Sequence, residues 1–214
     1  MIKGCIFDLD GVVVDTAKYH YLAWKRLANE LGFEFTEHDN ERLKGVSRMK
    51  SLEILLEIGK LSFDEDTKLK LAEKKNNWYV EYISKMDESE ILPGVKEFLS
   101  KLKESGYKIA LGSVSKNAMI ILENTNLKQY FDAIIDGNKV TKAKPDPEVF
   151  LKGAEELNLK PEECIVFEDA IAGIEAARRA NMKVIGVGSK EILKDADMVI
   201  EGFKNVSVDI LKAL

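Results

Sequence analysis

The sequence contains few of the residues that build metal centres and disulfide frameworks. Its 214 residues include two cysteines, Cys5 and Cys164, and two histidines. Each cysteine lies inside an apolar run, and no C-x-x-C pair or Cys/His cluster occurs. This usage indicates neither a zinc site nor a disulfide framework, and it predicts two buried, reduced thiols.

Long apolar segments and an excess of basic charge are also missing. The run MIKGCIFDLDG is broken by aspartates after a few residues, which is typical of neither a secretory signal nor a membrane span. The 32 basic and 37 acidic residues are interspersed and give a formal net charge of −5, unlike the basic surface of a nucleic-acid-binding protein. We therefore expect a cytoplasmic protein with no membrane and no nucleic-acid partner.

The sequence does hold material for a large core, because 45% of its residues are hydrophobic and 32% are charged. Short apolar runs predict strands at 2–7, 108–112, 133–136, 164–169, 184–187 and 198–200. Helical segments are predicted at 95–105, 116–126, 147–157 and 170–180. Alternation of strands and helices predicts an α/β protein with a Rossmann-like parallel sheet.

Residues 16–87 interrupt this alternation with helical periodicity alone. Thr16 or the residue before it is expected to begin the first of these helices, and Gly32 to end it. Ser62 and Glu65 have the spacing of a capping box and predict the start of the last one. The sequence therefore predicts a core domain of residues 1–15 and 88–214 with an inserted all-helical cap domain of residues 16–87.

Polar residues follow several of the predicted strands, at the sheet edge where ligands of parallel α/β proteins bind. They are Asp8, Asp10, Ser113, Ser115, Lys144, Glu168 and Asp169. Neighbouring carboxylates about 4 Å apart repel by about 4 kcal/mol, so converging aspartates require a cation. An all-oxygen site favours Mg²⁺ over zinc.

The same set of residues suits a phosphoryl group. Lys144 supplies positive charge, and Ser113 supplies a hydroxyl beside the backbone N–H groups that begin the next helix. With its charge balanced in this way, Asp8 can attack phosphorus and form an aspartyl-phosphate. Asp10 can then act as the general acid and base for the oxygens that leave and attack.

The segments FDLDGVVVDT, SVSKN, Lys144-Pro145 and FEDAIAGIEAA resemble, in order and spacing, the motifs of the haloacid dehalogenase superfamily of phosphotransferases. The segments LKGVSR, AEKKNNWYV, LPGV, YFDAI and KPDPEVF extend the similarity over essentially the whole chain, to the β-phosphoglucomutase family. This resemblance implies interconversion of β-D-glucose 1-phosphate and glucose 6-phosphate through an aspartyl-phosphate and β-glucose 1,6-bisphosphate. It also implies a monomer.

The resemblance implies a role for each residue near the transferred phosphoryl group. The nucleophile is Asp8, and the general acid and base is Asp10. Mg²⁺ is held by Asp8, the Asp10 backbone carbonyl and Asp169, with support from Glu168. The phosphoryl group is bound by Ser113 and Lys144. Thr16 and His20, four residues apart, are implied to couple cap closure to the position of Asp10.

The resemblance further implies a phosphosugar site between cap and core. Its expected residues are Trp24, Lys44, Gly45, Val46, Ser47, Arg48, Lys75, Asn76, Ser115, Lys116 and Asn117. Taken without the resemblance, Lys75 and the neighbouring Lys74 favour a solvated helix face, and Trp24, Trp78 and Tyr79 favour packing within the cap. His20 taken alone favours packing or the helix surface, and the cations of the Lys44–Arg48 loop are equally consistent with solvent exposure.

A phosphosugar phosphatase and a non-catalytic phosphosugar sensor are the two alternative functions. A phosphosugar phosphatase needs the same Asp8, Asp10 and Mg²⁺ but only one phosphate site. A phosphosugar sensor that does not catalyse needs neither a nucleophile nor a proton shuttle, so the presence of both aspartates argues against it. The chain also departs from the expected mutase pattern at Gly112 and Val114, which predicts a modest change in pocket shape.

Overall fold

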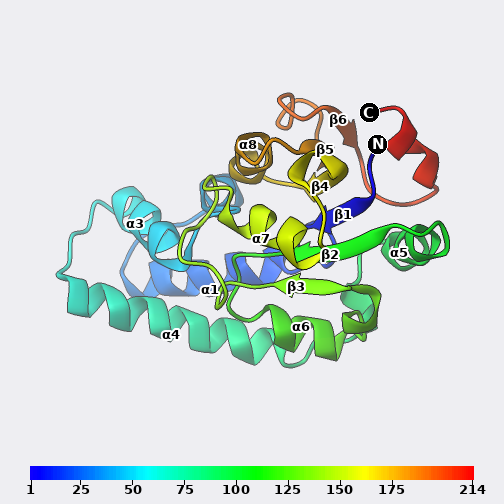
Figure 1. Ribbon diagram of the computed structural model, residues 1–214. Coiled ribbons are helices and arrows are strands. Elements are labelled where there is room, and N and C mark those ends of the chain that lie inside the picture. The colour runs from blue at the N-terminus through cyan, green and yellow to red at the C-terminus, as the bar shows by residue number, and fades with distance from the viewer.

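The computed structural model describes residues 1–214 and contains one six-stranded parallel sheet with the strand order β3-β2-β1-β4-β5-β6 (Figure 1). The strands are β1 (Gly4–Phe7), β2 (Lys108–Gly112), β3 (Ala133–Ile135), β4 (Cys164–Glu168), β5 (Lys183–Val187) and β6 (Met198–Ile200). All pairings are parallel, and Phe7 of the first strand lies between Leu111 and Phe167. The predicted α/β fold is confirmed.

Helices cover both faces of the sheet because successive strand residues point to opposite sides. Cys5 and Phe7 pack on the face covered by α5 (Val95–Glu104) and α6 (Ala118–Asn124). Ile6 packs on the opposite face, against α7 (Glu148–Glu156) and α8 (Ile171–Arg179). Both cysteines are buried and free, as the sequence predicted.

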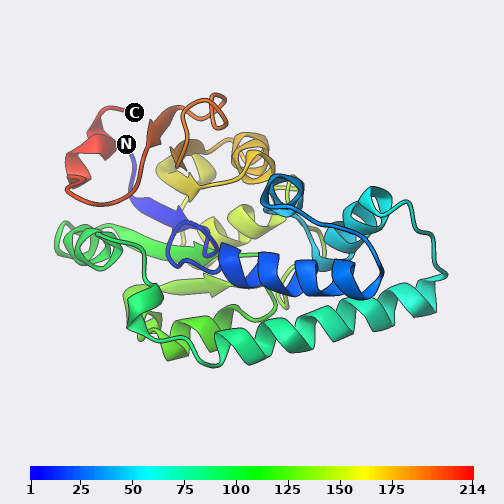
Figure 2. The ribbon, with the colours of Figure 1, turned by 180° about the vertical axis from the view of Figure 1, so that it is seen from behind.

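Four helices occupy the chain between β1 and α5 and form a separate layer beside the carboxyl ends of the strands (Figures 1 and 2). They are α1 (Ala17–Glu30), α2 (Glu37–Asn40), α3 (Arg48–Ile58) and α4 (Glu65–Ile83). We call this helical segment the cap. The chain enters and leaves it side by side, since the Asp15 N–H bonds the Glu90 carbonyl at 2.8 Å and the Leu92 N–H bonds the Val13 carbonyl at 3.1 Å.

The predicted start of the last cap helix is wrong. Helix α4 begins at Glu65, and its cap is Asp64, whose carboxylate accepts the Thr67 N–H at 2.8 Å; Ser62 makes no capping bond. Thr16 stands at the start of α1, but its hydroxyl bonds Asp10 in place of the helix backbone. The short second helix continues as a 3₁₀ turn, Glu41–Leu43.

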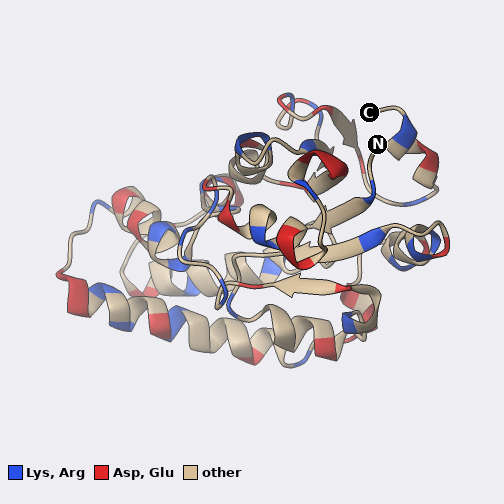
Figure 3. Cartoon of the chain, viewed as in Figure 1, with Lys and Arg blue, Asp and Glu red and all other residues tan.

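Charged residues of both signs alternate along the helices, most clearly on α4 (Figure 3). No helix has the length and apolar character needed to cross a bilayer.

Candidate active site

Three of the predicted residues meet in a buried ion-pair network at the carboxyl ends of β1 and β4. Lys144 Nζ lies 2.6 Å from an Asp8 carboxylate oxygen and 2.9 Å from Glu168 Oε1. The side chains of Lys144 and Glu168 are fully buried. The second oxygen of Glu168 accepts the Asp169 N–H at 2.8 Å. One lysine therefore fixes the position of Asp8 relative to the end of β4.

Asp8, Glu168 and Asp169 also form an acidic cluster, with one oxygen from each within 4.8 Å of the others. Burial raises the pKa of Asp8 to about 7, helped by the charges of Glu168 and Asp10 and opposed by Lys144. Burial and the charges of Glu168 and Asp8 raise the pKa of Asp169 well above its usual range. Since a divalent cation relieves this repulsion and carboxylate oxygen is its preferred ligand, the cluster fits a metal ion.

The backbone around the cluster leaves room only for glycine at two positions. Gly11 has φ +82°, and a Cβ there would lie 2.2 Å from Asp169 Oδ2. A Cβ on Gly173, in α8, would lie 1.6 Å from Glu168 Oε1. The absence of a side chain at Gly11 lets the Asp169 carboxylate lie against the turn after β1. The absence of one at Gly173 lets the Glu168 carboxylate lie against the start of α8.

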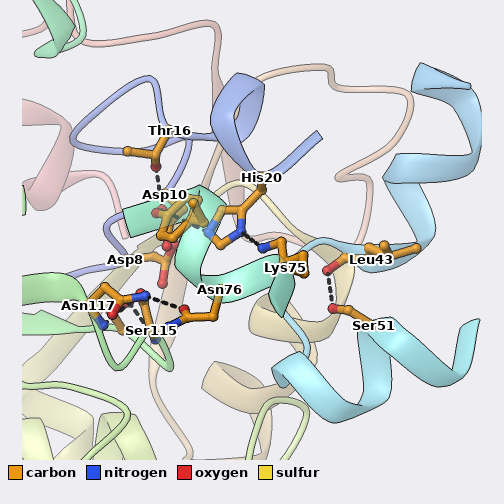
Figure 4. Close-up of polar contacts among 12 residues, drawn as sticks. Asp8, Asp10, Thr16, His20, Leu43, Ser51, Lys75, Asn76, Ser115 and Asn117 are labelled. Carbon is orange, nitrogen blue, oxygen red and sulfur yellow. Dashed lines mark hydrogen bonds and ion pairs between the residues drawn. The ribbon is translucent and has the colours of Figure 1, made fainter. Parts of the chain in front are cut away.

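The side chain of Asp10 lies beside Thr16 and His20 (Figure 4), and it is not a member of the acidic cluster. Its Oδ1 accepts the Thr16 hydroxyl and lies 3.6 Å from His20 Nε2 and 3.5 Å from the Tyr79 hydroxyl. Burial alone would raise the pKa of Asp10, but the contacts with His20 and Thr16 outweigh it and hold the pKa below its usual value. The carboxylate of Asp10 is therefore outside the candidate metal cluster and surrounded by proton donors.

Lys75 is buried, so the interpretation of Lys75 as part of a solvated helix face is wrong. Its Nζ lies 2.9 Å from His20 Nδ1 and over the rings of Trp24 and Tyr79, at 4.5 and 4.7 Å from their centroids. Burial and the nearby charge of Arg48 lower the pKa of Lys75 to about 7. The His20 ring stacks on the Tyr79 ring, with 4.0 Å between the ring centroids, and burial lowers the pKa of His20. A continuous chain of contacts thus joins Lys75 to Asp10.

A cavity of about 680 Å³ separates the cap from the sheet edge. That volume is in the range of pockets for small metabolites. The predicted residues that line it are Asp8, Asp10, His20, Trp24, Lys44, Gly45, Val46, Ser47, Arg48, Lys75, Asn76, Ser115, Lys116, Asn117 and Asp169. Trp24 is 2% exposed, so it belongs both to the cap core and to the cavity wall.

Direct contacts join the cap to the core beside the cavity. Asn117 Nδ2, at the start of α6, donates to Asn76 Oδ1 of α4 at 2.9 Å (Figure 4). A Cβ on Gly45 would lie 3.0 Å from the Ala170 Cβ, so the cap loop rests on the segment that follows Asp169. The cap is therefore in direct contact with the core on the α6 side and on the β4 side of the cavity.

Four predicted residues do not line this cavity: Thr16, Ser113, Lys144 and Glu168. Each is buried, and each makes a hydrogen bond to a residue that lines the cavity. The Ser113 hydroxyl accepts the Ser115 N–H at 3.1 Å and so shapes the turn before α6. Direct contact of Ser113 and Lys144 with a phosphoryl group stays a prediction.

Two features of the site are marked by no sequence motif. Tyr79 was interpreted as packing, yet its hydroxyl reaches Asp10; its spacing of four residues from Lys75 on one helix face was the available signal. The loop from Val140 to Ala143 lines the cavity, and no motif had marked it.

Residues 5–187 match the family model of haloacid dehalogenase-like hydrolases. The chain belongs to this family. It is 41% identical over 212 residues to a β-phosphoglucomutase of Bacillus subtilis, covering 98% of this chain and 94% of that protein. A crystal structure of β-phosphoglucomutase from Clostridium difficile superimposes with a TM-score of 0.94 at 44% identity, covering 100% of this chain and 96% of that one.

A second type of relative is also close. The chain is 34% identical over 203 residues to a phosphorylated carbohydrates phosphatase of Thermotoga maritima, covering 94% of this chain and 91% of that protein. Family membership thus agrees with the resemblance noted in the sequence, and the mutases are the more similar of these relatives.

Proposed function

We propose that this chain is a β-phosphoglucomutase, which interconverts β-D-glucose 1-phosphate and glucose 6-phosphate. The observation that carries this proposal is the full-length similarity to two β-phosphoglucomutases, at 41% and 44% identity. The cavity of about 680 Å³ supports it, because the carboxylates of Asp8, Asp10 and Asp169 line it together with the cationic side chains of Lys44, Arg48 and Lys75 from the cap. A mutase that works through a bisphosphate needs two phosphate sites.

At the sheet end, Asp8 is the nucleophile. Its carboxylate oxygen attacks phosphorus while the bond from phosphorus to the sugar oxygen breaks, which gives an aspartyl-phosphate and a sugar alkoxide that Asp10 protonates. In the other direction Asp10 takes the proton from the attacking hydroxyl. Lys144 and Ser113 offset the charge on the transferred group, and Thr16 and His20 hold Asp10 in place.

At the other end, the cap and the turn before α6 bind the second phosphate and the sugar. The residues proposed for this role are Trp24, Lys44, Gly45, Val46, Ser47, Arg48, Lys75, Asn76, Ser115, Lys116 and Asn117, all on the cavity wall. Phospho-Asp8 donates its phosphoryl group to the 6-hydroxyl of β-glucose 1-phosphate, which gives β-glucose 1,6-bisphosphate and frees Asp8. The bisphosphate then reorients, and its 1-phosphate returns to Asp8. A cap that closes only on a phosphosugar would keep water from the aspartyl-phosphate.

We propose Mg²⁺ as the metal, held by Asp8, Asp169 and the Asp10 backbone carbonyl, with Glu168 supporting the site. When bound, it supplies Lewis-acid stabilisation of the negative charge on the transferred phosphoryl group. The expected monomer and the expected cytoplasmic location stay predictions.

A phosphosugar phosphatase is the second candidate, favoured by the 34% identity to the Thermotoga maritima phosphatase. It would use Asp8 and Asp10 in the same way, with water in place of the sugar hydroxyl. The two functions differ in how well the closed cavity excludes water when Asp8 is phosphorylated.

The experiment that separates them follows two products in one reaction. The purified protein is incubated with Mg²⁺ and β-glucose 1-phosphate, with and without a trace of β-glucose 1,6-bisphosphate, and glucose 6-phosphate and free phosphate are measured together. A mutase forms glucose 6-phosphate faster with the bisphosphate and releases little phosphate. Free phosphate without isomerisation would replace this proposal with the phosphatase.

A further inference from the structure

Glu148, the first residue of α7, makes a set of contacts that the proposed reaction does not use. One of its carboxylate oxygens accepts three hydrogen bonds, from the Thr141 N–H at 2.9 Å, the Thr141 hydroxyl at 3.0 Å and the Lys142 N–H at 2.7 Å. Its other oxygen lies 3.0 Å from Lys152 Nζ, one turn along the helix. Glu148 therefore holds the backbone of a loop that precedes its own helix.

That loop joins the cavity wall to the network around Asp8. Residues 140–143 line the cavity, and the next residue is Lys144, whose Nζ bridges Asp8 and Glu168. The short connection back to α7 is fixed in turn, because the Asp146 N–H bonds the Ala143 carbonyl at 3.0 Å and Asp146 Oδ1 accepts the Glu148 N–H at 3.1 Å.

The contacts of Glu148 are suited to holding the loop backbone in one position. Its side chain is 18% exposed, so solvent competes only in part for the hydrogen bonds. The Lys152 ammonium and the Lys142 and Thr141 N–H groups lower the pKa of Glu148 to about 2, so the carboxylate stays charged at any working pH. Hydrogen bonds to a charged acceptor are roughly twice as strong as neutral ones.

We infer that Glu148 is a positioning residue for the transfer step: by holding the Thr141–Lys142 backbone it sets the place of Lys144 beside Asp8. This inference rests on the proposed role of Asp8 and Lys144. An error of 1 Å in a reacting group can lower a rate about a hundredfold. Because Glu148 does not touch the cavity, its loss should reduce kcat more than it changes KM.

The test compares Glu148→Ala, Glu148→Gln and Glu148→Asp with Glu155→Ala on the same helix. Glu155 is exposed and makes no side-chain hydrogen bond or ion pair, so it is the matched control. We expect Glu148→Ala to lower kcat at least about tenfold with KM within threefold of wild type, Glu148→Gln to lose less, and Glu148→Asp to recover part of the loss. The control should match wild type.

Two further readouts keep the test decisive. Glucose 6-phosphate and free phosphate are both measured, so that the effect on Asp8 chemistry is seen whether the wild type is a mutase or a phosphatase. Hydrogen exchange should speed up at the Thr141 and Lys142 amides in Glu148→Ala and not in Glu155→Ala, whatever the activity. Unchanged exchange at these amides, or wild-type kcat in folded Glu148→Ala and Glu148→Gln, would overturn the inference.

Discussion

Asp8 is the residue on which the proposed covalent route depends. Replacing it with asparagine removes the attacking carboxylate, so we expect turnover to fall by at least about a thousandfold. Exposed Asp15 is the matched control, and Asp15→Asn should keep its activity. Product formation and thermal melting are measured for both variants. Substantial turnover by folded Asp8→Asn would rule out the aspartyl-phosphate.

The lowered pKa of buried Lys75 predicts that the stability of the protein depends on pH. Its pKa is about 7 in the folded chain against 10.5 ordinarily. Between these values the unfolded chain binds a proton that the folded chain does not, so the free energy of unfolding from this residue rises with pH. Below pH 7 Lys75 is charged in both the folded and the unfolded chain, so burial of its charge lowers the free energy of unfolding by the full desolvation cost. Lys75→Met should therefore stabilise the protein more at pH 6 than at pH 9.

Urea unfolding of wild type and Lys75→Met at the two pH values measures this difference. We expect the advantage of the variant to shrink by about 1 kcal/mol or more from pH 6 to pH 9. An advantage that is the same at both values would mean that Lys75 titrates alike in the folded and unfolded chains.

At the scale of elements, helix α4 gives a paired test of its start. Asp64 accepts the Thr67 N–H, whereas Ser62 makes no capping bond. Asp64→Ala should lower the free energy of unfolding by about 1 kcal/mol, the usual cost of losing a cap. Ser62→Ala should leave it within about 0.5 kcal/mol of wild type, as for an ordinary surface change. If both variants lost the same free energy of unfolding, Ser62 would also cap the helix, as the sequence predicts.

The elements themselves were largely predictable from the sequence. The bounds of β2 and β6 agree with their apolar runs, because a short apolar run bounded by polar residues marks both ends of a strand. The start of α4 was not predictable, since Ser62 and Asp64 are both good caps two residues apart. Thr16 shows the same limit: its hydroxyl is used by Asp10, a partner that only the folded chain brings near.

At the scale of the whole molecule, predictability depended on how far apart in the chain the partners are. The strand-end residues were found because the sheet topology gathers them at one edge. The burial of Lys75 against His20 requires α4 to pack on α1, 55 residues earlier, and local patterns carry no sign of this. The loop held by Glu148 shows a different limit: its partners lie only six and seven residues earlier, but no spacing motif links a carboxylate to the backbone N–H groups of the loop before its helix.

The acidic cluster couples metal binding to the stability of the whole chain. Because burial and mutual repulsion raise the pKa values of Asp8 and Asp169, the cluster destabilises the metal-free fold and a bound cation stabilises it. At a Mg²⁺ concentration of about 100 times Kd the gain is about 2.7 kcal/mol. For a chain of this size that corresponds to a rise in Tm of roughly 5–10 °C.

Thermal melts of wild type, Asp169→Asn and the exposed control Asp195→Asn, with and without Mg²⁺, test this coupling. Asp169→Asn removes one of the repelling charges and one ligand, so its metal-free Tm should exceed that of wild type while its response to Mg²⁺ is lost. Asp195→Asn should keep the wild-type response, and a chelator should reverse it. If Asp169→Asn gained as much from Mg²⁺ as wild type, the ion would have to bind outside the cluster of Asp8, Glu168 and Asp169.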